Sequence, residues 1–237
     1  MFFEEGLALA KINHENIVRV TNFFRENNTV YMVMQYERGR SMQASILAET
    51  EPVSEQFVRR VFGELLNGLR EVHSQKLLHL DIKPANIYIR LDGSPVLLDF
   101  GSARQTLSEA QSKLPASFTS GFAPPEQYYD RKKLGPWSDI YSIGASMYSC
   151  LSRAAPIAAN KRIKKNFLPS AFSIGEGIYS PELLAIIDSC LQLDYLDRPQ
   201  CVFALQKALM TPAAAAQPKK LTIAQKIQAV FSKVPLR

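Results

Sequence analysis

A helix that crosses a bilayer needs about 20 consecutive apolar residues, and the sequence lacks any such run. Met1 is not followed by the basic, apolar and small-residue regions of a secretory signal peptide. Both absences argue against a membrane-spanning or secreted protein. We therefore expect a cytoplasmic protein.

Cysteine is scarce, with three residues in 237. Cys150, Cys190 and Cys201 are odd in number and form no C-x-x-C pair. Paired cysteines are typical of disulfide frameworks, zinc sites and redox motifs. The sequence instead predicts three free thiols in a reducing compartment.

Acidic residues are missing from the end of the chain. From Ala213 onward there are five basic residues and no Asp or Glu. The formal charge of the whole chain is +6, so residues 1–212 carry a net charge of +1. The basicity therefore belongs to a tail. This tail has Phe231 as its one aromatic residue, whereas nucleic-acid surfaces interleave basic and aromatic side chains. We expect no nucleic-acid partner.

The segment 79–101 concentrates polar residues with a shared chemistry. Four of them are types that can hold a terminal phosphate, a magnesium ion and an incoming hydroxyl: Asp81, Lys83, Asn86 and Asp99. Residues 87–89 and 96–98 predict two short strands joined by an Asp-Gly turn. That hairpin would return Asp99 to the side of Asn86, where two oxygen ligands could converge on Mg²⁺.

The sequence His-Leu-Asp-Ile-Lys-Pro-Ala-Asn, followed by Asp-Phe-Gly at 99–101, resembles the catalytic loop and DFG segment of the protein kinases. The resemblance implies that Asp81 orients the substrate hydroxyl and accepts its proton, and that Lys83 neutralises charge on the transferring phosphoryl group. It also implies that Asn86 and Asp99 bind Mg²⁺ and that the nucleotide is ATP. The Lys-Pro pair at 83–84 is similar to serine/threonine kinases, which implies an aliphatic hydroxyl acceptor.

The N-terminal region resembles part of the kinase small lobe. Its pattern predicts a helix over 2–12, equivalent to helix αC, and a hairpin of strands 17–24 and 29–36. Kinases also carry a glycine-rich loop and a β3 lysine before helix αC, and the four residues before Glu5 contain neither. Three explanations stay open: a fragment or misplaced start, a naturally shortened pseudokinase, or strands supplied by another chain. A two-stranded remnant would leave an unpaired edge.

The resemblance also places the nucleotide site. The expected residues are Glu5 as the αC glutamate, Met34 as the gatekeeper, Gln35 to Glu37 as the hinge, and Tyr88 beneath the adenine. The hinge would bind adenine through its backbone. Tyr88 departs from the usual aliphatic residue, and its hydroxyl needs a partner or water. Leu80 replaces the arginine of His-Arg-Asp, so we expect no dependence on a phosphorylated activation loop held by that arginine.

Residues 102–120 have no sustained period and resemble an activation segment, which closes with Gly-Phe-Ala-Pro-Pro-Glu-Gln-Tyr. The resemblance implies that Thr119 bridges Asp81 and Lys83. It further implies a buried, architectural pair between Glu126 and Arg198. This closing segment and Gly-Pro-Trp-Ser-Asp-Ile-Tyr are most similar to bacterial serine/threonine kinases.

Several helices are expected in the remainder. Ser54 predicts the N-cap of an amphipathic helix that ends near His73. Residues 137–151 resemble the central helix of the kinase large lobe, whose Asp139 would bond the catalytic-loop backbone. We expect His79 to be a packed anchor and assign His73 only a surface or capping role. The side-chain column that links the two lobes would consist of Leu9, Val20, His79 and Phe100, anchored by Asp139.

These features predict an α+β, protein-kinase-like fold with two lobes. The small lobe, over 1–36, would be truncated to helix αC and a two-stranded remnant, and an intact, mostly helical large lobe with the hinge would cover 37–210. Residues 153–180 are loop-rich, and two last helices cover 183–193 and 201–210. With 46% hydrophobic residues, 237 residues can bury such a core.

The remaining segment, 211–237, is a linker followed by a basic amphipathic tail. Five apolar residues of the tail fall on one helical face with lysines opposite: Ile223, Ile227, Val230, Phe231 and Val234. Two interpretations stay open. Residues 219–237 form a solvated or self-docking helix, or they lie on an anionic membrane or in a partner's groove, which would make the protein peripheral to the membrane.

The expected function is a serine/threonine protein kinase that transfers the γ-phosphoryl group of Mg·ATP to a protein substrate. A pseudokinase scaffold is the first alternative, since the small-lobe strands are missing, although a scaffold does not require the four polar residues of the loop. A small-molecule phosphotransferase is the second. The Lys-Pro pair, the Asp-Phe-Gly segment and the Glu126 segment favour a protein acceptor over it.

Overall fold

The computed structural model of the chain describes residues 11–27, 29–48, 51–100, 104–105 and 118–211. Most of the helix predicted over 2–12, including Glu5 and Leu9, lies outside the described residues, and so does the tail over 219–237. Within the described ranges, no helix combines the length and the apolar character that crossing a membrane requires.

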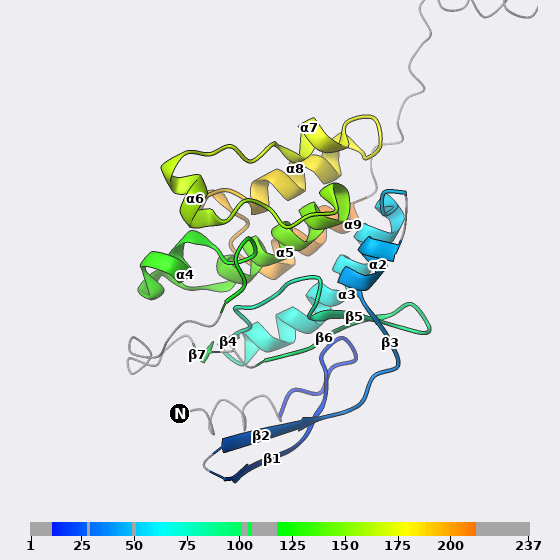
Figure 1. Cartoon of the computed structure of the whole chain (residues 1–237), viewed down its shortest axis with the longest axis vertical. Coiled ribbons are helices and arrows are strands. Elements are labelled where there is room, and N and C mark those ends of the chain that lie inside the picture. Colours follow the sequence, from blue (N-terminus) through cyan, green and yellow to red (C-terminus); the bar gives the residue numbers. More distant parts are fainter. Residues whose placement is uncertain (1–10, 28, 49–50, 101–103, 106–117, 212–237) are drawn as a thin grey trace, which may run out of the picture.

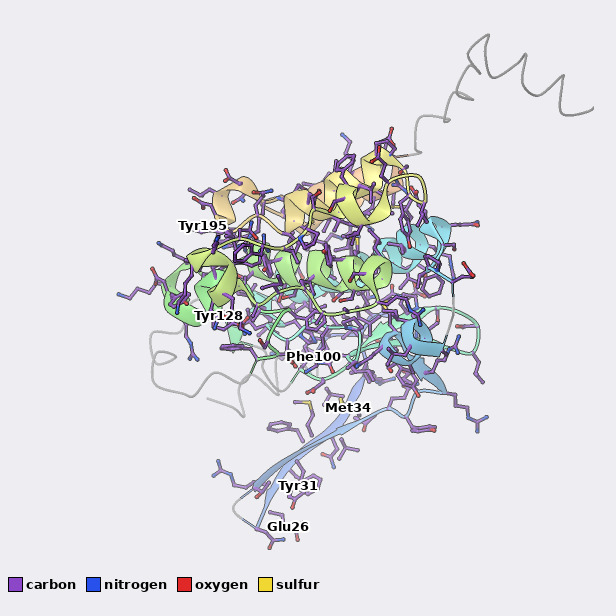
Figure 2. The ribbon with its side chains drawn as sticks, turned by 45° about the horizontal axis from the view of Figure 1, so that its top comes forward. Glu26, Tyr31, Met34, Phe100, Tyr128 and Tyr195 are labelled. Carbon is purple, nitrogen blue, oxygen red and sulfur yellow. The ribbon has the colours of Figure 1, made fainter. Side chains whose placement is uncertain are left out.

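The N-terminal part is an antiparallel hairpin of β1 (Val20–Glu26) and β2 (Thr29–Met34), which confirms the predicted hairpin. Phe24 and Tyr31 are cross-strand partners whose rings stack with their centroids 5.2 Å apart. The hairpin projects away from the helical body (Figure 1), and Tyr31 and Met34 lie on it (Figure 2). Both side chains are exposed, so the hairpin presents apolar surface.

A three-stranded sheet connects the hairpin to the helical body. Its central strand β5 (Ile87–Arg90) pairs antiparallel with β3 (Gly39–Ser41) and with β6 (Pro95–Leu97), which confirms the hairpin predicted after Asn86. Leu97 fixes the segment that leads into β1, because its N–H donates to Asn16 O at 2.9 Å and its carbonyl accepts from Val18 N–H at 3.0 Å.

Two long helices form the centre of the body. Helix α3 (Glu55–Ser74) begins at Ser54, whose hydroxyl accepts from Phe57 N–H at 3.3 Å, as the sequence predicts. Helix α5 (Pro136–Ser152) is buried at every position from 138 to 151. Helix α9 (Val202–Met210) packs on α3, and α8 (Pro181–Cys190) packs on α5 (Figure 1). All four helices were expected from the sequence.

The other elements are short: α2 (Met42–Ala48), β4 (Leu77–Leu78), β7 (Arg104–Gln105), α4 (Pro125–Tyr129), η2 (Arg131–Lys133), α6 (Ala159–Lys164), α7 (Ala171–Gly175) and η3 (Tyr195–Asp197). Region 153–180, predicted to be mainly loop, thus contains two helices. Helix α7 begins at Ser170, whose hydroxyl accepts from Ser173 N–H at 3.1 Å. The loop-rich composition concealed this N-cap.

Two of the cysteines belong to the core. Cys150 on α5 and Cys190 on α8 are buried, and burial raises the pKa of both thiols to about 12. Both therefore stay neutral at physiological pH, while Cys201 is exposed. A thiol with a raised pKa is a poor nucleophile and metal ligand, so these two residues act as small apolar side chains.

Candidate active site

The carboxylate of Asp139 anchors the backbone of the loop formed by residues 79–86. This carboxylate is fully buried on α5 and accepts from His79 N–H at 2.9 Å and from Leu80 N–H at 2.8 Å, which confirms the predicted contact. Leu80 has a φ of +62°, which costs a bulky L-residue about 1–3 kcal/mol. The Asp139 bonds, with one from Gln127 Nε2 to Leu80 O at 2.8 Å, stabilise this strained turn.

His73 is part of the same anchor, so the expectation of a mere surface or capping histidine is wrong. Its Nε2 lies 2.8 Å from Asp139 Oδ2. Burial pushes the pKa of Asp139 upward, but the hydrogen bond and charge of His73, together with His79, outweigh burial and lower that pKa. Asp139 is therefore ionised and can accept all three bonds.

His79 is the packed anchor that the sequence predicts. Its ring is fully buried, with Nδ1 3.2 Å from Asp81 N–H and Nε2 3.0 Å from Leu98 O. Since Nδ1 accepts, Nε2 carries the proton and donates. Burial lowers the pKa of His79 and keeps the ring neutral. The ring also packs on Phe100 with centroids 4.6 Å apart, and Val20 is buried as well; Leu9, the fourth member of the expected column, lies outside the described residues.

Asp81, Lys83, Thr119 and Asn86 form one hydrogen-bonded group. Lys83 Nζ lies 2.6 Å from Asp81 Oδ2 and donates to Thr119 Oγ1 at 2.7 Å. Thr119 Oγ1 donates in turn to Asp81 Oδ1 at 2.8 Å, so the predicted bridge by Thr119 is present. Asn86 Nδ2 donates to Asp81 O at 2.9 Å and to Asp81 Oδ2 at 3.2 Å. These hydrogen bonds hold the Asp81 carboxylate in one orientation.

Asn86 and Asp99 provide oxygen atoms suited to a hard cation. Asn86 Nδ2 donates to Asp81, so the amide oxygen is the Asn86 side-chain atom that could bind a cation. Leu98 N–H donates to Asn86 O at 2.8 Å, so β5 and β6 deliver Asp99 beside Asn86, and the Asp99 side chain is exposed. An amide oxygen next to a carboxylate fits Mg²⁺, which prefers oxygen ligands.

Glu126 and Arg198 form the predicted buried ion pair. Arg198 Nη1 donates to Glu126 Oε1 at 2.8 Å, and Nη2 donates to Oε2 at 3.1 Å. Arg198 also donates to the carbonyls of Trp137, Gln192 and Leu193, while Ser138 Oγ donates to Glu126 Oε1 at 2.8 Å. Both charges are thus satisfied, and the pair joins α4, which follows Thr119, to the start of α5.

The family model described as "Protein kinase domain" matches residues 1–210. The chain belongs to the protein kinase family. It is 32% identical over 167 residues to "Serine/threonine-protein kinase B" of Synechocystis, covering 66% of this chain and 29% of that protein. It is 30% identical over 209 residues to the mouse protein "Serine/threonine-protein kinase Nek1", covering 87% of this chain and 17% of that protein. The chain thus spans less than a third of each of these two relatives.

A solved structure described as "PpkA-294 apo form" has the same kinase fold. It superposes with a TM-score of 0.75 at 33% identity, covering 88% of this chain and 73% of that chain. The fold expectation of an α+β, two-lobe kinase domain with a reduced small lobe is therefore confirmed, as is the resemblance to bacterial serine/threonine kinases.

The segment expected to form the hinge, residues 35–37, follows β2. Met34 ends this strand and is exposed, and Gln35 N–H donates to Arg19 O at 2.8 Å. The Glu37 carboxylate accepts from Arg90 Nε at 2.7 Å and from Nη2 at 3.0 Å. These bonds raise the pKa of Arg90 and tie Glu37 to β5. The side chain of Glu37 therefore has a structural contact, which agrees with a hinge that binds through its backbone.

Tyr88 finds its hydroxyl partner within the kinase domain. Tyr88 Oη donates to Gly39 O at 2.8 Å, so the departure from an aliphatic residue is accommodated without water. The approach of β3 to β5 also requires a glycine at 39, because a Cβ there would lie 2.0 Å from Ile89 O. The sequence did not indicate the Tyr88–Gly39 contact or the Glu37–Arg90 pair, which join residues about 50 positions apart.

Proposed function

We propose that the chain is the catalytic part of a serine/threonine protein kinase that transfers the γ-phosphoryl group of Mg·ATP to a hydroxyl of a protein substrate. The contact set of Asp81 with Lys83, Thr119 and Asn86 carries this proposal, since it fixes a carboxylate and a cation within 2.6 Å of each other. Catalysis of phosphoryl transfer consists mostly of such positioning and electrostatic stabilisation.

The fixed geometry supports the following roles. Asp81 orients the substrate hydroxyl and receives its proton as the new O–P bond forms and the bond to the ADP oxygen breaks. Lys83, held by Asp81 and Thr119, places its ammonium group beside the phosphoryl group that moves. Thr119 fixes the Asp81 carboxylate by donating to Oδ1, the oxygen that Lys83 does not contact.

Asn86 and Asp99 are the residues that would hold magnesium. The ion would supply positive charge that neutralises the phosphates of the nucleotide. The Asn86 amide is oriented by its two bonds to Asp81, so its oxygen faces away from Asp81. The backbone of residues 35–37, held by Arg19 and Arg90, would pair with adenine above the ring of Tyr88.

Phosphate transfer from labelled ATP to serine-, threonine- and tyrosine-containing peptides, with and without Mg²⁺, tests the proposal. We expect Mg²⁺-dependent label on Ser and Thr and none on Tyr. Transfer that persists in excess EDTA, or that prefers Tyr, would contradict the assigned roles. No transfer to any peptide, with ATP still bound, would favour a scaffold instead.

A further inference from the structure

A cavity of about 260 Å³ opens directly beside the proposed phosphotransfer group. Lys83 and Thr119, which both contact the Asp81 carboxylate, are among the residues that line it. Its volume lies below the range of about 300–1,000 Å³ that is typical of small-molecule sites. A cavity of this size next to Asp81 suits one side chain of the substrate that presents the acceptor hydroxyl.

The walls of the cavity are held in place by the fold. Gln43 N–H donates to Pro84 O at 3.0 Å and fixes α2 against the loop that carries Lys83. Ser142 Oγ donates to Phe122 O at 2.9 Å and fixes another part of the lining. Gly121 has a φ of +94°, and a Cβ on it would lie 2.8 Å from Pro156 O, so only glycine permits the 121–122 segment to pack this closely on 155–156. The cavity is therefore a formed part of the domain.

The chemistry of the walls is apolar with a positive rim. Ile46 and Leu47 from α2, Pro84 and Phe122 contribute apolar surface, and Leu47 is 62% exposed at the edge. Two cations line the cavity, Lys83 and Arg153, and Arg153 Nη2 lies 3.5 Å from Leu47 O. Among the described residues that line it, none is Asp or Glu. Lys83 is paired with Asp81, and no lining carboxylate could pair with an incoming basic side chain, which Arg153 would repel.

We propose that this cavity selects substrates in which a bulky apolar residue lies within a few positions of the phosphorylated serine or threonine, and that it rejects arginine or lysine there. The proposal rests on the proposed kinase function. Burying one leucine-sized side chain gives about a tenfold or greater gain in binding, enough to decide between peptides. Arg153 adds discrimination by repelling basic residues.

The test uses serine peptides of an otherwise small, neutral sequence. Leu, Arg or Ala is placed at each of the four positions on either side of the serine, which spans about 14 Å of extended chain on each side. We expect the full chain to show a kcat/KM about tenfold higher for Leu than for Ala at one position, and lower for Arg than for Ala at that position. Equal rates at every position, or a preference for Arg, would overturn the proposal.

Two variants and a control locate the effect. Leu47→Glu should abolish the preference for Leu, and Arg153→Glu should remove the penalty for Arg. Leu196→Glu is the matched control, because Leu196 is 65% exposed on η3 and does not line the cavity. A Leu preference that survives Leu47→Glu, or an Arg penalty that survives Arg153→Glu, would assign the selectivity to another surface and overturn the proposal.

A binding measurement separates this proposal from the kinase function. Fluorescence anisotropy with the same peptides, serine replaced by alanine, needs no turnover. Phosphate transfer could be absent while the Leu peptide still binds about tenfold more tightly than the Ala peptide and Leu47→Glu abolishes this difference in affinity. In that case the cavity is a peptide site and only the proposed activity fails. If peptides are phosphorylated but bind without preference for Leu, only the cavity proposal fails.

Discussion

The Glu126–Arg198 pair makes the strongest stability prediction. Exposed fractions of the two side chains are 3% and 0%, so neither charge can recover hydration from bulk water when its partner is changed. Glu126→Gln keeps the shape of the side chain and the contact with Ser138 but leaves the Arg198 guanidinium without a counter-charge. Breaking a buried pair on one side costs about 3–5 kcal/mol. We expect that loss for Glu126→Gln.

The assay is urea unfolding followed by circular dichroism, with thermal unfolding in parallel. Because 1 kcal/mol shifts the Tm of a domain of about 150–250 residues by about 2–4 °C, the Tm should fall by about 6–20 °C. Glu182→Gln is the matched control on the exposed first turn of α8, with an expected change within about 0.5 kcal/mol. A loss below about 1 kcal/mol for Glu126→Gln would refute the argument that burial makes this pair structurally critical.

Three further predictions concern the anchors of the site. Burial lowers the pKa of His79 below its ordinary 6.5, so the unfolded chain binds a proton at this residue more readily than the folded chain. The free energy of unfolding, measured with urea, should therefore decrease as the pH falls below 6.5, and it should decrease less steeply in His79→Gln. An equal slope in both proteins would contradict a buried neutral imidazole. Gly39→Ala should lower stability by about 1–3 kcal/mol in the same assay, since the methyl group collides with Ile89 O; an unchanged midpoint would show that β3 can move away from β5. Arg90→Lys should lower the free energy of unfolding by about 1 kcal/mol and raise the KM for ATP, because lysine cannot donate to both carboxylate oxygens of Glu37 at once. An unchanged KM would show that the Arg90–Glu37 pair does not affect ATP binding by the hinge.

The sequence predicts those parts of the structure that depend on local pattern or on a motif. The N-cap Ser54 and its apolar spacing place α3, and the Asp-Gly turn places β5 and β6. The resemblance to kinases brings Thr119 to Asp81 and Arg198 to Glu126 across long stretches of sequence, and both contacts are present. No local rule would have indicated either contact.

The contacts that were missed join side chains whose relative position depends on tertiary packing. His73 and Asp139 lie 66 positions apart and meet only because α3 and α5 pack together. The pair of Glu37 and Arg90 similarly depends on the pairing of β3 with β5. His73 and Arg90 resemble ordinary surface residues in the sequence, because their spacing from Asp139 and Glu37 has no periodicity that would mark a contact.

The most direct test of the proposed function is the initial rate of phosphate transfer from labelled Mg·ATP to a serine peptide by the wild-type chain and by Asp81→Asn. Asparagine cannot accept the hydroxyl proton, so the rate should fall by about 10²–10⁴-fold. The control Asp92→Asn removes an exposed carboxylate in the β5–β6 turn and should keep the wild-type rate. Measurable transfer that is equal in the wild type and Asp81→Asn would contradict the central role of Asp81.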